Sequence, residues 1–343
     1  MLVSPAQRDL VTLARLRLLP FVLGLPLAGW GWAHWDRALP STSGDSILFV
    51  LAAWTLLHAG TLWLNAAVDR DQGEVLFGRA AQVPPIAVPA AALALAASVL
   101  VAAAASVWSA IAAALCAALA VVYSHPRDPW KAHPVGGPFV NVAGYGVLSP
   151  FAGWATVGVA ADVRTLAVWG LAALGILGTY LVAQAFQGDE DRGRGYRTLV
   201  ATHGPTVVLN AARVAIGIAF AGCVALCIAG WMPRPCLLGA VGFLPVDGGL
   251  RHWARQADGG SERWARGFTF RLGGALLLGI LLAYGEYVRE SLSGEPVAGL
   301  GTVAGHPPDR PRLAPQALRR WERAESPFIS GMLGTPVATE RIR

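Results

Sequence analysis

Charged residues are scarce in this chain, and the few present are unevenly distributed. Only 14% of the 343 residues are Asp, Glu, Lys or Arg, whereas a soluble domain carries about a quarter. Residues 80–126, 165–188 and 214–233 contain none. Uncharged stretches of about 20 apolar residues are what a bilayer-crossing helix requires, because lipid offers the backbone no other hydrogen-bond partner. The apolar runs show no alternation with a period of two, which excludes a membrane β-barrel.

Cysteine is also scarce. The four cysteines, all in or beside apolar stretches, are Cys116, Cys223, Cys227 and Cys236. Two of them share a helix face, but two thiols without His or further Cys do not make a metal site. We interpret them as small buried residues. We expect no cleavable signal, because the apolar stretch from Leu18 to Trp35 is too long for one and has no clear cleavage site, and we interpret it as the first transmembrane helix.

These absences predict an all-α, polytopic membrane protein with about nine transmembrane helices in a bundle. The predicted spans cover residues 17–35, 46–65, 85–105, 107–124, 136–158, 165–187, 206–231, 235–250 and 268–287. The eighth is the weakest, since Pro245 and Asp247 interrupt it. Asp247 is either a kinked functional position or, as we favour, a loop residue of a short span.

Basic residues set the expected orientation. With the N-terminus in the cytoplasm, the inner segments carry fifteen Lys and Arg and the outer loops three, which agrees with the positive-inside rule. The basic loops at the inner membrane surface therefore explain the net charge of +6, and we expect no nucleic acid partner. We predict an integral protein of the bacterial cytoplasmic membrane, with residues 1–290 as the transmembrane domain. Residues 291–343 form a Pro/Gly-rich, partly flexible tail on the opposite side.

Two acidic segments occur at equivalent places. Asn65 and Asp69 end the second span, and Gln187 and Asp191 end the sixth. In each pair an amide precedes a carboxylate by four residues, so both side chains lie on one helix face. Both pairs fall at the cytoplasmic ends of even-numbered spans. We expect them at one membrane depth, where they could face each other across the bundle.

Hard oxygen ligands grouped in this way suit Mg²⁺, which proteins hold by one or two carboxylates together with phosphate oxygens and waters. Solvated loop charge is the alternative, and for Asp71 or Arg194 taken singly we favour it. For Asp69 and Asp191 as a pair we favour a joint metal or diphosphate role, since acids at the membrane edge are costly and usually functional. Tyr123 and Lys131, between the segments, either contact a phosphate or serve as an interfacial anchor and a positive-inside lysine.

Three motifs follow one another along the chain: Asn65-x-x-x-Asp69-Arg70, then Tyr123-Ser124-x-Pro126 with Lys131, then Asp191-Arg192-x-x-Gly195-x-Arg197-Thr198-Leu199 with Gly204. Their order and placement, over roughly residues 10–290, resemble the UbiA superfamily of intramembrane prenyltransferases. The resemblance implies a nine-helix bundle around a central cavity and Mg²⁺ that binds a prenyl diphosphate. It also implies loss of pyrophosphate and attack of the allylic cation on an aromatic or other lipophilic acceptor.

The chain departs from the usual family motifs. The first motif generally reads Asn-Asp-x-x-Asp-x-x-x-Asp, but here the second and last positions are Ala66 and Gly73. The second motif usually opens with Asp, where this chain has Gln187. Nearby acids could restore the ligand count: Asp71, Glu74, Asp189 and Glu190. We therefore expect a variant-motif member with altered metal ligation rather than an inactive one.

Roles follow residue by residue from the resemblance. The expected metal ligands are Asn65, Asp69, Asp71, Glu74, Asp189 and Asp191. The expected catalytic residues are Asp69, Asp191, Lys131 and Tyr123. Substrate contacts are expected from Asn65, Arg70, Gln184, Gln187 and Arg197, with the arginines and Lys131 suited to charge-assisted bonds with phosphate. Tyr145 and Tyr180 lie well inside spans and are candidates to line a cavity.

Two alternatives remain open. A terpene cyclase on the same bundle needs the same metal motifs. It differs in that the cation is captured by another double bond of the same prenyl chain. An ion-coupled transporter would use Asp69 and Asp191 to bind a coupling ion, but transporter sites lie near the bilayer midplane and these motifs lie at one edge. A CDP-alcohol phosphotransferase is disfavoured because its signature is missing.

Overall fold

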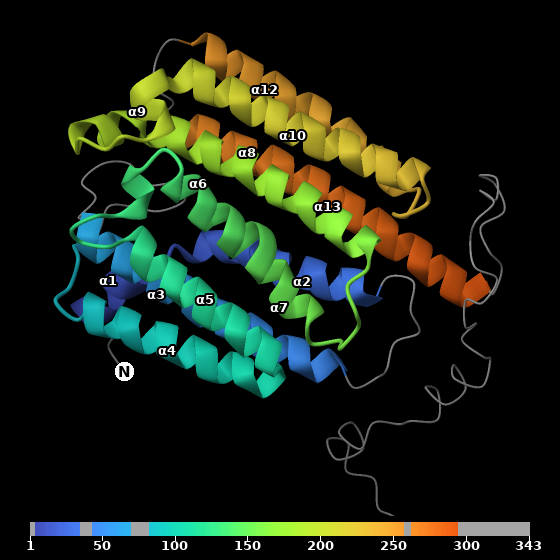
Figure 1. Cartoon of the computed structure of the whole chain (residues 1–343), viewed down its shortest axis with the longest axis horizontal. Coiled ribbons are helices and arrows are strands. Elements are labelled where there is room, and N and C mark those ends of the chain that lie inside the picture. The colour runs from blue at the N-terminus through green and yellow to red at the C-terminus, as the bar shows by residue number, and fades with distance from the viewer. Residues whose placement is uncertain (1–3, 35–42, 70–81, 257–261, 294–343) are drawn as a thin grey trace, which may run out of the picture.

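The computed structural model of the chain describes residues 4–34, 43–69, 82–256 and 262–293, and within these ranges every regular element is helical (Figure 1). The helices of the first half are α1 (Pro5–Leu13), η1 (Leu16–Leu18), α2 (Leu19–His34), α3 (Ser43–Asp69), α4 (Ala87–Ala105) and α5 (Val107–Tyr123). A broken segment follows: η2 (Trp130–Ala132), α6 (Gly136–Asn141), η3 (Val142–Leu148) and α7 (Ser149–Trp154). The rest comprises α8 (Val163–Gly193), α9 (Leu199–His203), α10 (Pro205–Ile228), α11 (Cys236–Gly239), η4 (Ala240–Gly242), α12 (Phe243–Arg255) and α13 (Glu262–Ser293). The predicted all-α class is confirmed.

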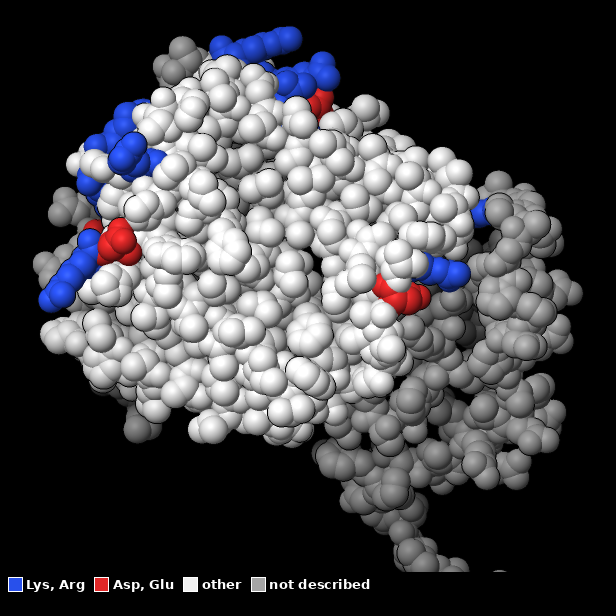
Figure 2. Space-filling view, viewed as in Figure 1, with Lys and Arg blue, Asp and Glu red and all other residues white. Residues whose placement is uncertain are grey.

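Six of the helical segments are long and apolar enough to cross a membrane: Pro5–His34, Ser46–Asp69, Ala87–Ala105, Val163–Gly193, Pro205–Ile228 and Glu262–Ala283. Helix α5 is equally apolar but shorter. Large apolar side chains point outward along them, with Leu93 and Leu100 more than 70% exposed. Figure 2 shows a broad uncharged surface with charged side chains gathered toward its edges. This surface suits lipid.

The predicted count of nine spans is not confirmed, because two of the nine are interrupted. The span predicted at 136–158 is divided into α6, the π-helical η3 and α7. The span predicted at 235–250 is divided into α11, η4 and α12. Helix α13 continues to Ser293, and the remainder of the predicted tail, 294–343, lies outside the described residues.

Pro150 accounts for the break in the first of these spans. Proline has no N–H to donate to the preceding turn, and membrane helices accommodate this with local π adjustments and hydroxyl side chains. Here the Ser149 hydroxyl donates to the carbonyl of Gly144 over 2.8 Å. The Ser149 oxygen in turn accepts from the indole N–H of Trp54, also over 2.8 Å. The carbonyl of Gly144 also accepts the backbone N–H of Ser149, so these bonds brace the π turn directly before Pro150. The bond from Trp54 ties α7 to α3.

The core consists of two apolar clusters. One joins α3, α4, α5 and α7, and its largest fully buried side chain is Trp54. The other joins α8, α9, α10, α12 and α13 around Leu209, Ile216 and Trp253. In Figure 1 the first group occupies the lower half of the molecule and the second the upper half. Each acidic motif therefore belongs to a different half: Asp69 to the first and Asp191 to the second.

Helices α2 and α7 pack unusually closely through a reciprocal pair of glycines. A Cβ on Gly29 would lie 1.8 Å from the carbonyl oxygen of Pro150, and a Cβ on Gly153 would lie 1.9 Å from that of Pro26. Both glycines are buried. Small residues at such contacts allow backbones to approach, which is how helices associate where lipid supplies no hydrophobic drive.

The structure of the eighth predicted span contradicts the expectation for Asp247. Asp247 is not a loop residue: it lies within α12, is buried, and accepts hydrogen bonds from the guanidinium groups of Arg213 and Arg251. Proline at position 245 is tolerated because it falls in the first turn of α12, where no intrahelical N–H bond is lost.

The glycine contact predicts opposite effects of one substitution at two neighbouring positions. Gly29→Ala forces a methyl group into the Pro150 carbonyl, and overpacking of this kind costs about 1–3 kcal/mol. Gly31→Ala on the same helix has open space around it and gains up to about 1 kcal/mol of helix propensity. Thermal unfolding in detergent should show a lower Tm for Gly29→Ala and an equal or higher one for Gly31→Ala. Equal Tm changes for the two would mean that the α2–α7 contact does not limit stability.

Candidate active site

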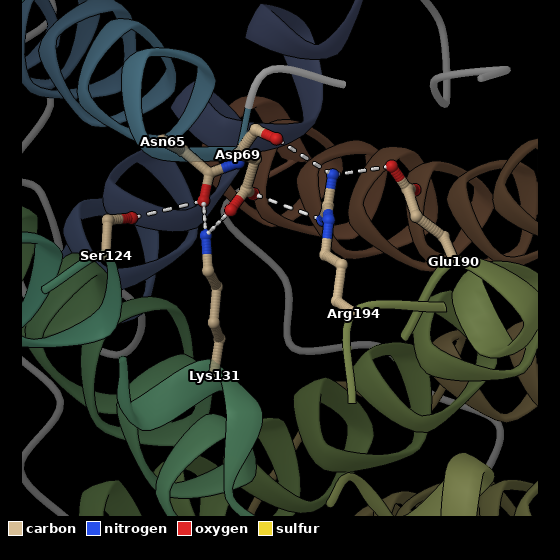
Figure 3. Close-up of polar contacts among 6 residues, drawn as sticks. All are labelled: Asn65, Asp69, Ser124, Lys131, Glu190 and Arg194. Atoms are coloured by element: carbon tan, nitrogen blue, oxygen red, sulfur yellow. Dashed lines mark hydrogen bonds and ion pairs between the residues drawn. The ribbon is translucent and has the colours of Figure 1, made fainter. Parts of the chain in front are cut away.

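The first motif presents its two oxygen-bearing side chains at the described end of α3. Asn65 and Asp69 are one helical turn apart, and the Asp69 side chain is only 6% exposed. Asn65 Oδ1 accepts from Lys131 Nζ over 2.9 Å and from the Ser124 hydroxyl over 3.1 Å. Lys131 Nζ also donates to Asp69 Oδ1 in a short ion pair (Figure 3). One ammonium group thus lies between the amide and the carboxylate.

Lys131 is in this position because the chain turns sharply after α5. Helix α5 ends at Tyr123, and the short η2 turn begins directly after Pro129. The lysine in that turn is buried, with 7% of its side chain exposed. Its Nζ also lies 5.9 Å from the centre of the Tyr123 ring. An interfacial positive-inside lysine would be solvated, so the burial favours the other interpretation, a charge directed into a site.

The second motif is positioned by the end of α8. The N–H of Gly195 donates to the carbonyl of Arg192, and the N–H of Tyr196 donates to that of Asp191. This pair of bonds is the Schellman motif, and Gly195 adopts the left-handed φ of +70° that it needs. The loop then turns back over the helix end, and the Thr198 hydroxyl donates to Asp191 Oδ2 over 2.8 Å. Asp191 is consequently only 8% exposed although it lies in the last turn.

Arg194 joins the two motifs, which corrects its interpretation as an ordinary loop charge. One of its terminal nitrogens donates to the carbonyl oxygen of Asp69 over 3.3 Å and to Glu190 Oε1 over 2.6 Å. Its other terminal nitrogen lies 3.8 Å from Asp69 Oδ2. Figure 3 shows Arg194 and Lys131 approaching Asp69 from different sides. Asp69 of the first half-bundle is therefore held by cations from two separate loops.

These side chains surround one cavity of about 40 Å³, lined by Asn65, Asp69, Tyr123, Lys131, Tyr180, Gln184, Gln187, Asp191, Arg194 and Tyr196. The α8 residues among them extend from Tyr180 to Asp191, about 16 Å along the helix axis at 1.5 Å per residue. One water molecule needs about 10–15 Å³ of such cavity space, so the cavity has room for only a few waters. A larger ligand therefore requires the lining side chains to move.

The inner end of the cavity contains a polar atom without a partner. Gln184 is 2% exposed, and its amide nitrogen donates to the Tyr180 hydroxyl over 2.9 Å. Its Oε1 has no hydrogen-bond partner. A buried polar atom left in this state costs about 1–3 kcal/mol, so such atoms in native proteins usually serve a purpose. Here the carbonyl group is available to a polar ligand.

Several predicted site residues do not line the cavity. Asp189 is 82% exposed and pairs with Arg192 on the surface. Arg197 is exposed, and its backbone N–H donates to the carbonyl of Ala132, which ties the second loop to the η2 turn. Arg70, Asp71 and Glu74 lie outside the described residues. Of the two tyrosines expected near a cavity, Tyr180 lines this one and Tyr145 does not.

Ser124 and Thr198 belong to the motifs quoted above but were given no role from the sequence, and Tyr196 was not selected. Ser124 and Thr198 each hold one motif oxygen, and Tyr196 lines the cavity. Gly195 after an arginine at a helix end was a usable signal, because glycine at that position indicates a chain that folds back over the helix. That reversal would have placed residues 196–198 beside Asp191.

The donor set fits a metal ion that shares its ligands with a phosphate. Among the residues that the structure describes, no three His, Cys, Asp or Glu side chains form a metal cluster by themselves. Asn65, Asp69 and Asp191 nevertheless direct hard oxygens into one cavity. That is the protein share expected for Mg²⁺, which takes one or two carboxylates and completes its octahedron with phosphate and water. The carbonyl end of α8 adds partial negative charge near Asp191.

The described helices thus form a polytopic bundle with a buried site of carboxylates, amides and cations at one end. The sequence model of the UbiA prenyltransferase family matches residues 17–274, and the chain therefore belongs to that family. No curated protein sequence matches the chain.

Solved structures agree on the fold. A UbiA homolog from Archaeoglobus fulgidus bound to DMAPP and Mg²⁺ superposes with a TM-score of 0.57 at 17% identity, covering 79% of this chain and 99% of that one. A UbiA homolog from Aeropyrum pernix K1 gives 0.54 at 17% identity, with 81% and 100% covered. A digeranylgeranylglyceryl phosphate synthase gives 0.58 at 13% identity, with 83% and 100% covered.

The ion pair between Lys131 and Asp69 predicts a rescue. Lys131→Met leaves a buried carboxylate, and removing one partner of a buried pair costs about 3–5 kcal/mol. The loss should be smaller here, because Arg194 remains 3.8 Å from Asp69. Adding Asp69→Asn removes the uncompensated charge, so the double variant should unfold at a higher temperature than Lys131→Met. A double variant no more stable than the single one would show that the pair is not an energetic unit.

Proposed function

We propose that the protein is a Mg²⁺-dependent intramembrane prenyltransferase that moves a prenyl group from a prenyl diphosphate to an aromatic or other lipophilic acceptor. The observation that carries the proposal is the convergence of Asn65, Asp69 and Asp191 with Lys131 and Arg194 on one buried cavity. The family match and the A. fulgidus homologs bound to DMAPP or GPP with Mg²⁺ support it.

Asn65, Asp69 and Asp191 are the residues that would hold the metal in the described part of the chain, with Asp71 and Glu74 as further proposed ligands. Bound Mg²⁺ neutralises a diphosphate and makes it a better leaving group, as a Lewis acid does. The A. fulgidus homolog bound to DMAPP and Mg²⁺ supports the choice of this metal together with a prenyl diphosphate. Ala66, Gly73 and Gln187 stand where the family motifs usually have carboxylates, so the proposed ligation is altered and relies on the nearby acids Asp71 and Glu74.

The chain's own cations would bind the leaving group. Lys131 and Arg194 both contact Asp69, and both can exchange that carboxylate for diphosphate oxygens without leaving the cavity. Arg70 and Arg197 are further proposed contacts. The amides of Gln184 and Gln187 would accept or donate hydrogen bonds along the same side of α8. Tyr123, against Lys131, would present its ring and hydroxyl to the substrate.

In the proposed reaction the bond between the prenyl carbon and the diphosphate oxygen breaks, and pyrophosphate leaves with the electron pair. The allylic cation then forms a new bond with an electron-rich carbon or heteroatom of the acceptor, which loses a proton. A buried site excludes water, which would otherwise capture the cation. The same end of the bundle is proposed to face the cytoplasm of a bacterial cell, in agreement with the Lys and Arg bias of the loops.

Carboxylate substitutions test the site. Asp69→Asn and Asp191→Asn should each reduce pyrophosphate release from a prenyl diphosphate by at least about 100-fold, the usual cost of removing one electrostatic contact to a transition state. Asp189→Asn is the matched control, because that acid is 82% exposed on the same helix end and should retain near-parental activity. Release by Asp69→Asn and Asp191→Asn at the control rate would refute the assignment.

Metal removal is a separate test. Chelation of purified protein should stop pyrophosphate release, and Mg²⁺ should restore it, because the described carboxylates are too few to bind a metal tightly without the diphosphate. Activity that persists in excess chelator would contradict a metal-dependent reaction.

Product analysis distinguishes transfer from cyclisation. The proposal predicts that pyrophosphate release requires an added lipophilic acceptor and that the prenyl group appears on it. Release without any acceptor, together with a cyclic hydrocarbon in the extract, would identify a terpene cyclase on the same site instead.

A further inference from the structure

A second and larger pocket lies between α10 and α12, apart from the candidate active site. It measures about 300 Å³, and its lining residues are Thr206, Asn210, Arg213, Arg251, Ala254 and Arg255. None of them lines the active-site cavity. Helix α10 starts shortly after the loop that covers Asp191, so the pocket is at the same end of the bundle as the active site.

The pocket is formed by two polar helix faces turned away from the core. On α10, Thr206, Asn210 and Arg213 follow spacings of four and three and therefore share one face. On α12, Arg251 and Arg255 are four apart and share another. The opposite faces of the two helices carry the buried apolar residues of the second core cluster. Both polar faces are thus directed toward the lipid-facing side, where arginines are expensive unless they have a partner.

Three arginines and one carboxylate define the charge of the pocket. Asp247 Oδ1 accepts from Arg213 Nε and Asp247 Oδ2 accepts from Arg251 Nε, both over 2.7 Å. Asn210 Oδ1 accepts from Arg213 Nη1 over 2.9 Å. Three guanidinium groups against one carboxylate leave a formal charge of +2. The Arg251 side chain is 58% exposed, so fixed guanidinium groups are presented to an outside anion.

The depth at which these arginines lie in the membrane is that of the lipid headgroups. Residues 214–233 carry no charge, and α10 continues as far as Ile228. The helical part, 214–228, is about 22 Å long, and with the uncharged turn that follows it crosses most of the hydrocarbon core, which is about 30 Å thick. Arg213 directly precedes this stretch and therefore lies where hydrocarbon gives way to headgroups. Figure 2 shows Lys and Arg side chains at the upper edge of the molecule, the region that α12 occupies in Figure 1.

An apolar surface continues from the pocket toward the middle of the membrane. Val214 and Ile218 on α10 are 62% and 53% exposed, and Leu244 on α12 is 69% exposed. A positive pocket above an exposed apolar surface matches the shape of a phospholipid, with its phosphate at the arginines and its acyl chains along the helices. A free anion would use only the first part of this surface.

We propose that this pocket binds the headgroup phosphate of an anionic phospholipid and that the bound lipid ties α10 to α12. The arginines recognise the phosphate through charge-assisted hydrogen bonds, as basic pockets between membrane helices do for anionic lipids. The net charge of the pocket selects an anionic headgroup over a zwitterionic one, whose own cation is repelled.

The test uses the full-length protein in detergent, titrated with phosphatidylglycerol, phosphatidylcholine of the same chains, or inorganic phosphate. Tm and lipid retention in native mass spectrometry are measured. Phosphatidylglycerol should raise the Tm and be retained, and the other two should do so much less. Arg255→Gln removes a pocket charge without touching the Arg213–Asp247–Arg251 bonds and should weaken phosphatidylglycerol binding about tenfold, as expected for one hydrogen bond to a charged group.

Arg263→Gln is the matched control, an exposed arginine at the start of α13 that is outside the pocket and should bind the lipid like the parent. Equal effects of phosphatidylglycerol and phosphatidylcholine would overturn the charge selectivity. Equal effects of inorganic phosphate and phosphatidylglycerol would show a free-anion site and overturn the lipid assignment. Equal lipid binding by Arg255→Gln and Arg263→Gln would overturn the location.

Discussion

The carboxylate of Asp69 is the buried charge at which the two halves of this bundle are joined by ion pairs. Asp69 belongs to α3, whose apolar face is buried in the first core cluster. Its carboxylate accepts a hydrogen bond from the ammonium group of Lys131, which follows α5. Arg194, which reaches it from the end of α8, belongs to the second half. A buried acid is tolerable only with such partners, since an unpaired charge in a low-dielectric interior is very costly. The ion pairs therefore hold the two helix ends at one place, and they also hold the chemistry there.

The same arrangement makes the site responsive to a ligand. Each cation at Asp69 is a group that phosphate binds well, and each acceptor oxygen is one that Mg²⁺ binds well. A metal ion would take the place of the cations at the carboxylates, and a diphosphate would take the place of the carboxylate at Lys131 and Arg194. Each charged side chain would then still have a partner of opposite charge. The cavity of about 40 Å³ is small because these groups now neutralise one another across it. We therefore expect that the ligand binds and the cavity widens in a single step, in which the ion pairs of Asp69 are replaced by contacts to the ligand.

Much of this could be predicted from the sequence. The charge-free runs indicated the helices, and the spacing of Asn65 with Asp69 and of Gln187 with Asp191 placed each pair on one face. The structure brings all four to one cavity. The eighth span was expected to be interrupted at Pro245 and Asp247, and the structure divides it just before them. The break at Pro150 was not predicted, because apolar composition does not reveal how a helix accommodates a lost hydrogen bond. The contact of Thr198 with Asp191 was missed because it depends on a loop that reverses at Gly195. Arg194 was misjudged as a loop charge because Asp69, 125 residues away, is its neighbour only in space. Asp247 was misjudged because its partner Arg213, 34 residues away, is visible only in space.

The central claim is that the two motifs act as one site for a metal-bound diphosphate. A double-variant cycle on Asp69 and Asp191 tests it most directly, with binding of a non-cleavable prenyl diphosphate analogue measured by calorimetry in the presence and absence of Mg²⁺. The account predicts that the parent binds only with Mg²⁺, that Asp69→Asn or Asp191→Asn alone abolishes most of that binding, and that the double variant loses little more than either single one. Independent, additive losses, or Mg²⁺-dependent binding that survives in both single variants, would contradict a shared site.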